Sequence, residues 1–166
     1  IGLGHTRIGF ITGDQRYGAS QARHEGYLAA MKARGLKVDK AWIQPGDFTF
    51  ESAHKAATAL LALDQRPTAI FASSDEMALG ALAAAAEAEL SCPADLSVAG
   101  FDDSPVSRLS RPQLTTIRQP LVEMSTLATK MLINGVARNA EAGARPRDEL
   151  LPFTLIHRAS TAPPKG

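Results

Sequence analysis

Several features that would assign a function directly are scarce in this chain of 166 residues. A single cysteine, Cys92, excludes an internal disulfide framework and fits a reducing compartment. No apolar run approaches the roughly 18 residues of a membrane-spanning helix, and no signal-peptide pattern is visible. The formal net charge of +1 is too balanced to indicate nucleic acid or an anionic membrane by itself. We therefore expect a protein of the cytoplasm that makes no membrane contact.

Catalytic signatures are also lacking. There is no GxSxG, and no GxGxxG follows a predicted strand. The stretch from Gly13 to Gly18 has the spacing of a phosphate loop, but Ala19 stands where that loop needs its lysine. The histidines, which are His5, His24, His54 and His157, are scattered without the spacing of metal ligands. We therefore predict no catalytic residue, no metal site and no cofactor.

What the chain does contain is a regular alternation of short apolar runs with helix-forming stretches. Strands are predicted at residues 7–12, 38–43, 68–72, 96–101, 115–118 and 149–156, and helices at 20–34, 50–63, 75–89 and 121–136. Residues 139–148 are predicted to be a loop, and residues 159–166 a flexible tail. This alternation predicts an α/β fold with a parallel sheet and helices on both faces.

Polar and aromatic residues follow the predicted strands where each one ends. The groups are Gly13-Asp14, Asp47-Phe48, Ser73-Ser74-Asp75 and Asp102-Asp103. In parallel sheets ligands bind outside the carboxyl ends of the strands. This edge of the sheet is therefore predicted to bind a hydroxyl-rich small molecule.

Single residues at this edge allow more than one interpretation. Arg23 is either a solvated helix residue or a fork of donors aimed at the strand ends. Asp102 and Asp103 allow three interpretations. They could act as a catalytic acid and base, one could cap the following turn while the other is solvated, or one carboxylate could accept hydrogen bonds from ligand hydroxyls. Phe48 is either a core residue or a stacking wall for a ring. An alanine-rich face of the helix at 75–89 indicates internal packing or a dimer contact.

Five motifs resemble the LacI/GalR family of transcriptional regulators. They are GHTRIGFITG at 4–13, RHEG at 23–26, ASSDEMALG at 72–80, VAGFDD at 98–103 and PQLTTIRQP at 112–120, in order over nearly the whole chain. The resemblance implies that residues 1–158 are part of an effector-binding domain of the type I periplasmic-binding-protein-like fold, mainly its C-terminal subdomain. Residues 121–136 would cross back toward the N-terminal subdomain. The chain opens without an initiator methionine, and we interpret it as a piece of a longer protein whose DNA-binding helix-turn-helix lies upstream.

The family's ligand contacts transfer to this sequence by position. Arg23 and Asp102 match its polar effector contacts, and Phe48 its aromatic wall. Ser74 stands where many members carry asparagine, Tyr17 replaces a polar contact, and Leu121 would add apolar floor. In this interpretation Asp103 holds the turn rather than the ligand. The predicted dimer contacts are Leu79, Leu82, Ala83, Ala86 and Val106, on the helix at 75–89 and in the loop at 106–111.

These expectations combine into one function. The chain is predicted to be the sensor portion of a bacterial regulator that binds a small effector, preferably a sugar, as a homodimer and controls operator DNA through the upstream domain. The first alternative is a periplasmic sugar-binding protein of a transport system, which shares the fold. The second is a hydrolase or sugar-modifying enzyme that uses the two aspartates, but no nucleophile or second carboxylate accompanies them.

Overall fold

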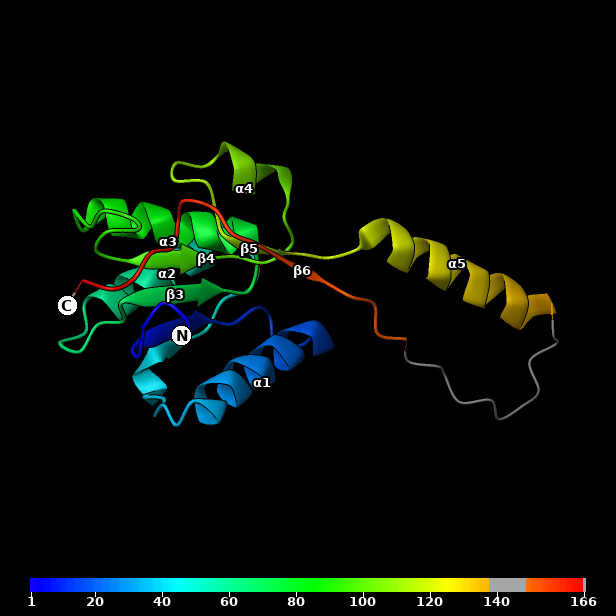
Figure 1. Cartoon of the computed structure of the whole chain (residues 1–166), viewed down its shortest axis with the longest axis horizontal. Coiled ribbons are helices and arrows are strands. Elements are labelled where there is room, and N and C mark those ends of the chain that lie inside the picture. Colours follow the sequence, from blue (N-terminus) through cyan, green and yellow to red (C-terminus); the bar gives the residue numbers. More distant parts are fainter. Residues whose placement is uncertain (138–148, 166) are drawn as a thin grey trace.

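A four-stranded parallel sheet forms the centre of the computed structural model, which describes residues 1–137 and 149–165 (Figure 1). The strands lie in the order β2, β1, β3, β4, which are Ile43–Gln44, Ile8–Ile11, Ala69–Ala72 and Ser97–Ala99. β1 pairs in parallel with both β2 and β3, and β3 pairs in parallel with β4. The predicted α/β fold with a parallel sheet is confirmed.

Helices cover both faces of this sheet. α1, Gly18–Ala33, packs on one face, where Phe10 contacts Tyr27 and Met31. α2, Phe50–Leu61, and α3, Asp75–Glu87, pack against each other on the other face, with Ile11 in their apolar core. Successive strand residues point to opposite faces of a sheet, so Phe10 packs against α1 and its neighbour Ile11 packs against α2 and α3.

The α2–α3 layer is close-packed because small residues line it. A Cβ added to Gly80 would lie well inside 3.0 Å of the Phe50 carbonyl oxygen, so only glycine allows the two helix backbones to approach this closely. The buried alanines of both helices, among them Ala53 and Ala81, serve the same contact. This explains the alanine-rich composition of α3, whose inner face is core.

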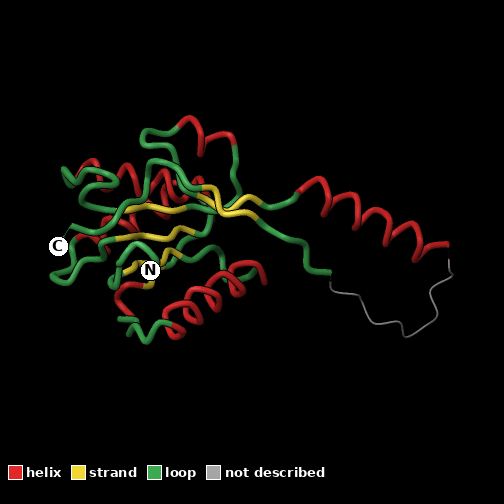
Figure 2. The backbone as a smooth tube through the Cα atoms, in the orientation of Figure 1, coloured by secondary structure: helices red, strands yellow, loops and turns green. Residues whose placement is uncertain are grey.

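Two crossing strands leave the sheet and lead to an outlying helix. β5, Thr116–Arg118, and β6, Thr154–Ile156, pair antiparallel, and α5, Leu121–Ala137, extends away from the body (Figures 1 and 2). The segment that contains β5 also runs beside β4, since the Gly100 N–H donates to the Thr115 carbonyl. The crossing strands are therefore continuous with the edge of the sheet.

Several predicted elements differ from the structure. The strand predicted at 38–43 is instead a 3₁₀ helix, Lys40–Trp42, followed by the two-residue β2; the Asp39 carboxylate caps the 3₁₀ helix by accepting from the Ala41 N–H. A short helix, α4, Pro105–Leu109, was not predicted, although proline favours the first helical turn. The last predicted strand is confined to β6. The loop predicted at 139–148 lies outside the described residues.

The tail predicted to be flexible is fixed through residue 165. Ser160 is fully buried. Its carbonyl accepts from the Val98 N–H at 2.8 Å, and its Oγ donates to the Val98 carbonyl at 2.6 Å. The Ala162 N–H donates to Ser97 Oγ at 3.0 Å. Polar groups rather than apolar ones hold this segment, which is why its composition indicated a free end.

Candidate ligand-binding site

The carboxyl ends of the strands bring the central predicted residues together. Phe48 follows β2, Ser74 follows β3 and Asp102 follows β4, while Arg23 reaches this edge from α1. Arg23 Nη2 lies 3.8 Å from Asp102 Oδ1. The side chains are 15% and 36% exposed, so the pair is partly sheltered yet open on one side.

Two aromatic rings hold the Arg23 guanidinium in place. It lies 4.0 Å from the centre of the Phe101 ring and 5.9 Å from that of Phe48. Burial lowers the pKa of Arg23, and the nearby Asp102 carboxylate acts in the opposite direction. Arg23 makes no hydrogen bond to any described residue at the usual distances, so its donors are available to a ligand.

Asp102 has an unusual backbone and an incompletely bonded carboxylate. Its φ is 119°, a region that L-residues rarely adopt, and its N–H donates to the Ile117 carbonyl at 2.8 Å. Gln119 Nε2 donates to Oδ1 at 2.7 Å, whereas Oδ2 accepts from none of the described residues. Burial raises the pKa of Asp102, although Arg23 and the Gln119 hydrogen bond lower it in part. Strained backbone and unsatisfied polar atoms are typical of functional sites.

Phe48 forms a wall beside the charged pair. Its φ of 73° is also in the left-handed region, and its ring lies where a Cβ on Gly13 would be. The glycine after β1 therefore makes room for this ring. Tyr17 lies 6.1 Å from it, centre to centre, but is 57% exposed, so it borders the site rather than lining it.

Of the two remaining predicted ligand contacts, Ser74 lines a hollow at this edge and Leu121 does not. Ser74 is buried at the start of α3, where its Oγ accepts from the Met77 N–H, and it lines a hollow of about 690 Å³ together with Phe48 and Asp102. Its cap role uses a lone pair and leaves the hydroxyl hydrogen available. Leu121 begins α5 and is exposed, and it lines none of the hollows described for residues 1–137 and 149–165.

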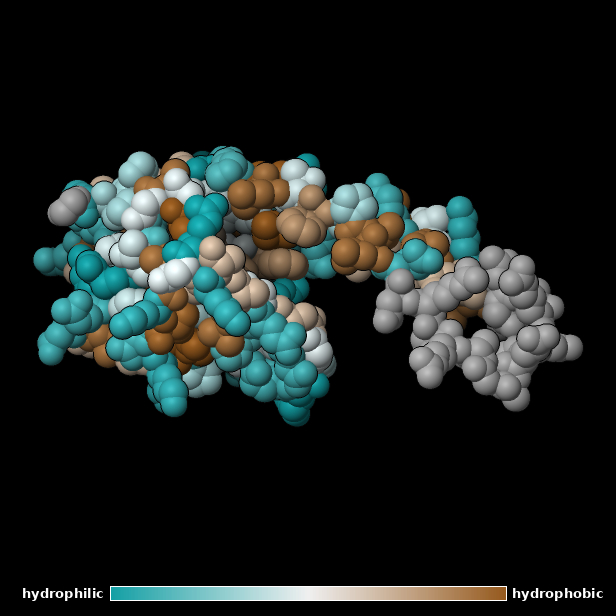
Figure 3. Space-filling model, turned by 60° about the horizontal axis from the view of Figure 1, so that its bottom comes forward, coloured by the Kyte–Doolittle hydropathy of each residue, from teal (hydrophilic) through white to brown (hydrophobic). Residues whose placement is uncertain are grey.

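A larger hollow of about 1040 Å³ adjoins the site on the α1 side. Arg23, Phe101 and Gln119 line it where it adjoins the site. The remaining lining is largely apolar, with Phe71 and Met124 among its residues, but also contains polar side chains such as Ser97 and Thr161. Figure 3 shows hydrophobic side chains both where the body meets the outlying arm and along that arm. Gln119 was not predicted as a site residue, although it belongs to the quoted RQP motif of the crossing strand.

Asp103 faces away from these hollows into a cluster of arginines. Its carboxylate, 1% exposed, accepts from Arg118 Nε at 2.6 Å and from Arg108 Nη2 at 3.3 Å, and it forms a third ion pair with Arg158. Burial would raise the pKa of Asp103, but these arginines, Arg158 first, lower it from 3.8 to about 2. The three arginines come from α4, β5 and the segment after β6. Asp103 thus ties both crossing strands to the β4 turn.

The predicted dimer contacts lie on one outer surface. Leu79, Leu82 and Ala83 are half-buried on α3, Ala86 is exposed, and Val106 is half-buried on α4. Leu79 and Val106 also line the hollow that contains Phe48 and Asp102. This surface therefore adjoins the candidate site, and its role in dimerisation stays a prediction.

Among residues 1–137 and 149–165, no three His, Cys, Asp or Glu side chains are grouped so that they could hold a metal ion. None of the helices described there combines the length and the apolar character that a membrane crossing needs.

Comparisons with known proteins agree on one family. The model of the periplasmic binding protein-like domain matches residues 1–161. The transcriptional repressor CytR of Escherichia coli (strain K12) is 42% identical over 159 residues, and a PurR repressor of Pectobacterium carotovorum is 41% identical over 162. These alignments cover 95% and 98% of this chain but only 46% and 47% of the two repressors. The chain thus spans about half the length of these relatives, both of which are transcriptional repressors.

Solved structures give the same result. A LacI family transcriptional regulator from Mycobacterium smegmatis superposes with a TM-score of 0.89 at 31% identity, covering 99% of this chain and 60% of that one. The regulator CelR, solved as a cellobiose complex, superposes with a TM-score of 0.89 at 32% identity, covering 96% and 48%.

Proposed function

This chain belongs to the LacI family of transcriptional regulators, as part of its periplasmic binding protein-like domain, and from this premise we propose that it senses a small effector for a longer DNA-binding protein. One observation carries the proposal. Arg23 and Asp102 lie 3.8 Å apart beside an aromatic wall, each with hydrogen-bonding capacity that no described residue uses. Free donors on one side chain and a free acceptor on the other suit the pair to holding a ligand.

The chemistry of the pair favours a neutral ligand with neighbouring hydroxyl groups. Arginine donates to hydroxyl oxygens and the aspartate accepts from hydroxyl hydrogens, so a vicinal diol can satisfy both at once. The Phe48 ring offers an apolar face on which a sugar ring can stack. A sugar or a related hydroxyl-rich metabolite is therefore the proposed effector class, and the cellobiose complex of CelR is consistent with it.

The proposed mechanism is a shift between two states. Asp102 is bonded through its N–H to Ile117 and through Oδ1 to Gln119, both in the segment that leads out to α5. A ligand that competes for Oδ1 changes the anchoring of that segment. If the ligand binds more tightly to one arrangement of the crossing strands, it shifts the population toward that arrangement.

The rest of the regulator is proposed from the same family. α5 exposes Val122, Leu132 and Ile133 to 76%, 71% and 62%, which supports packing of this helix on the N-terminal subdomain of the full protein. The α3–α4 surface would form a homodimer. Operator DNA would be bound through an upstream domain in the cytoplasm.

The test is a thermal-shift screen of the full-length protein against sugars, sugar phosphates and nucleobases, followed by calorimetry with the hit. A ligand that binds only the native state raises its melting temperature with concentration. Arg23→Ala and Asp102→Ala should each weaken binding by about tenfold or more, because a charged hydrogen bond contributes about 1.5–3 kcal/mol. Arg34→Ala, an exposed arginine at the other end of α1, is the matched control. Wild-type affinity in both site variants would refute the assignment.

A further inference from the structure

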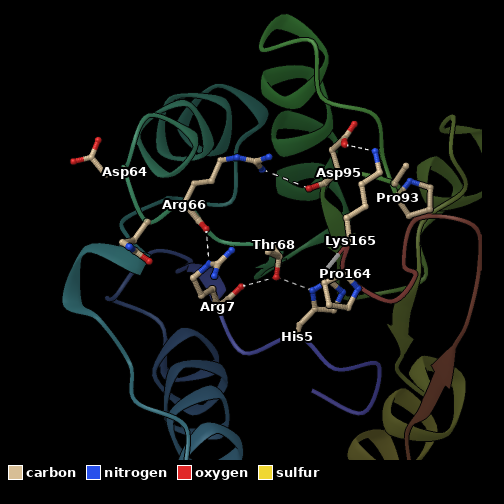
Figure 4. A pocket seen from close by; sticks show the side chains of 11 residues that line it. His5, Arg7, Asp64, Arg66, Thr68, Pro93, Asp95, Pro164 and Lys165 are labelled. Carbon is tan, nitrogen blue, oxygen red and sulfur yellow. Dashed lines mark hydrogen bonds and ion pairs between the residues drawn. The ribbon is translucent and has the colours of Figure 1, made fainter.

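A separate polar hollow of about 480 Å³ lies at the opposite edge of the sheet, where the strands begin (Figure 4). Arg7 precedes β1, Arg66 and Thr68 precede β3, and Asp95 precedes β4. Lys165 reaches the same hollow from the C-terminal segment. Four stretches of chain that are far apart in sequence therefore bring charged side chains to one place.

The hollow is lined by three cationic side chains, Arg7, Arg66 and Lys165, and by two carboxylates, Asp64 and Asp95. Arg7 uses only Nε, which donates to the Arg66 carbonyl at 3.1 Å, and its two terminal nitrogens have no hydrogen-bond partner among the described residues. Arg66 has one long bond, from Nη1 to the Asp95 carbonyl at 3.4 Å. Figure 4 shows both side chains extending toward the same space, while the Asp64 carboxylate points away from it.

One carboxylate partly offsets these cations. Asp95 Oδ1 lies 2.6 Å from Lys165 Nζ, and this hydrogen bond is the main reason why the pKa of Asp95 is lowered, so the carboxylate stays ionised at neutral pH. Asp95 therefore pairs with Lys165, and the nearby charge of Arg66 also lowers its pKa. One carboxylate thus offsets two of the three cations, and the terminal nitrogens of Arg7 keep no partner among the described residues.

The floor of the hollow is held in place by a buried histidine. His5 Nδ1 lies 2.8 Å from Thr68 Oγ1, and His5 Nε2 lies 2.8 Å from the Ala162 carbonyl oxygen. Burial lowers the pKa of His5, so the ring is a neutral link rather than a further cation. This link fixes the C-terminal segment against the start of β3 and keeps Lys165 at the rim.

We propose that this hollow is a second ligand site, which binds a phosphate group at Arg7 and Arg66. Two guanidinium groups with free N–H donors match the oxygens of a phosphate in both charge and geometry. The volume lies within the range of small-molecule sites, which leaves room for an organic part attached to the phosphate. The shared chemistry is the phosphate group, and its source is either the free ion or a small phosphate ester.

The experiment is calorimetry on the full-length protein with inorganic phosphate, glycerol 3-phosphate and glucose 6-phosphate, at constant ionic strength, with glycerol and glucose as unphosphorylated references. Binding of the phosphates but not of the references supports the site. Tighter binding of an ester than of inorganic phosphate assigns the source to the ester, and equal binding assigns it to the free ion. No binding of any phosphate overturns the proposal and leaves the arginines as counter-charges to the negative C-terminal ends of α2 and α3.

Variants separate this site from the proposed effector site. Arg7→Gln with Arg66→Gln should weaken phosphate binding at least tenfold, while Arg34→Gln should not change it. Arg7→Gln alone, at an exposed position, provides a second test in case the double variant fails to fold, and a loss of at least threefold is expected. Asp102→Ala should retain phosphate binding at this edge; if it abolishes all phosphate binding, the ligand occupies the other edge and the proposal is wrong.

Discussion

The turn after β4 divides two regions that use the same chemical group in opposite ways. On its open side, Asp102 borders a hollow, and its Oδ2 accepts no hydrogen bond from the described residues. Burial raises the pKa of Asp102. On its closed side, Asp103 is paired with three arginines, and its pKa falls to about 2. The difference lies in how completely the surroundings satisfy each carboxylate. Satisfied groups stabilise the fold, and incompletely satisfied ones remain available to a ligand.

The largest loss of folding stability is expected from removing the negative charge of Asp103, on the closed side of the turn. Asp103→Asn should lower the free energy of unfolding by about 3 kcal/mol, because one uncharged amide would face three arginines, of which Arg158 is only 11% exposed. Chemical denaturation monitored by circular dichroism measures this loss. Asp14→Asn is the control, since Asp14 pairs with the exposed Arg16, and its midpoint should stay near that of the wild type. Equal stability of all three proteins would contradict the assigned role of Asp103.

A smaller loss of folding stability is expected when the pH is lowered. The pKa of Asp103 is about 2 in the folded chain and near 3.8 when it is free of its partners. Its stabilising contribution is therefore complete above pH 4 and is lost as the pH falls from about 4 to about 2, which amounts to about 2 kcal/mol. Denaturation midpoints across this range should fall more steeply for the wild type than for Asp103→Asn. Parallel pH profiles would show that other groups dominate acid unfolding.

The smallest effect on stability is expected on the open side. Burial raises the pKa of Asp102, so folding disfavours the ionised carboxylate. This cost in folding free energy is fully present at a pH above the pKa of the folded chain, and it disappears below the usual pKa of an aspartate. Asp102→Asn should therefore leave the ligand-free stability unchanged or slightly raised at neutral pH, while it weakens effector binding. A stability loss as large as that of Asp103→Asn would show that the two sides of the turn do not differ.

The sequence predicted the layers of the fold better than its polar connections. Apolar runs such as the one before Gly13 identify buried strands, because a sheet covered on both faces needs continuous hydrophobicity. The rule that ligands bind at the carboxyl ends of strands pointed to Phe48 and Asp102, and the family resemblance added Arg23 from the neighbouring helix. That their side chains converge needed the structure, since two of them depend on positive φ angles.

The polar network was less predictable for a physical reason. The partners of Asp103 lie 5, 15 and 55 residues further along the chain, and hydrophobic periodicity carries no information about such pairs. The same holds for Ser160, whose burial depends on hydrogen bonds to Val98, 62 residues away. Residues with many hydrogen-bonding options can be assigned partners only once the backbone path is known.

The position of residues 158–162 has a consequence for biosynthesis. Ser160 pairs with Val98 along β4, and Thr115 covers the continuation of the same edge at Gly100. Until residues 158–162 leave the ribosome, the amino half of β4 has no neighbour on that side and Asp103 lacks Arg158. A nascent or truncated chain that ends before them therefore presents a bare strand edge to other molecules, and residues 158–162 close that edge once they are made.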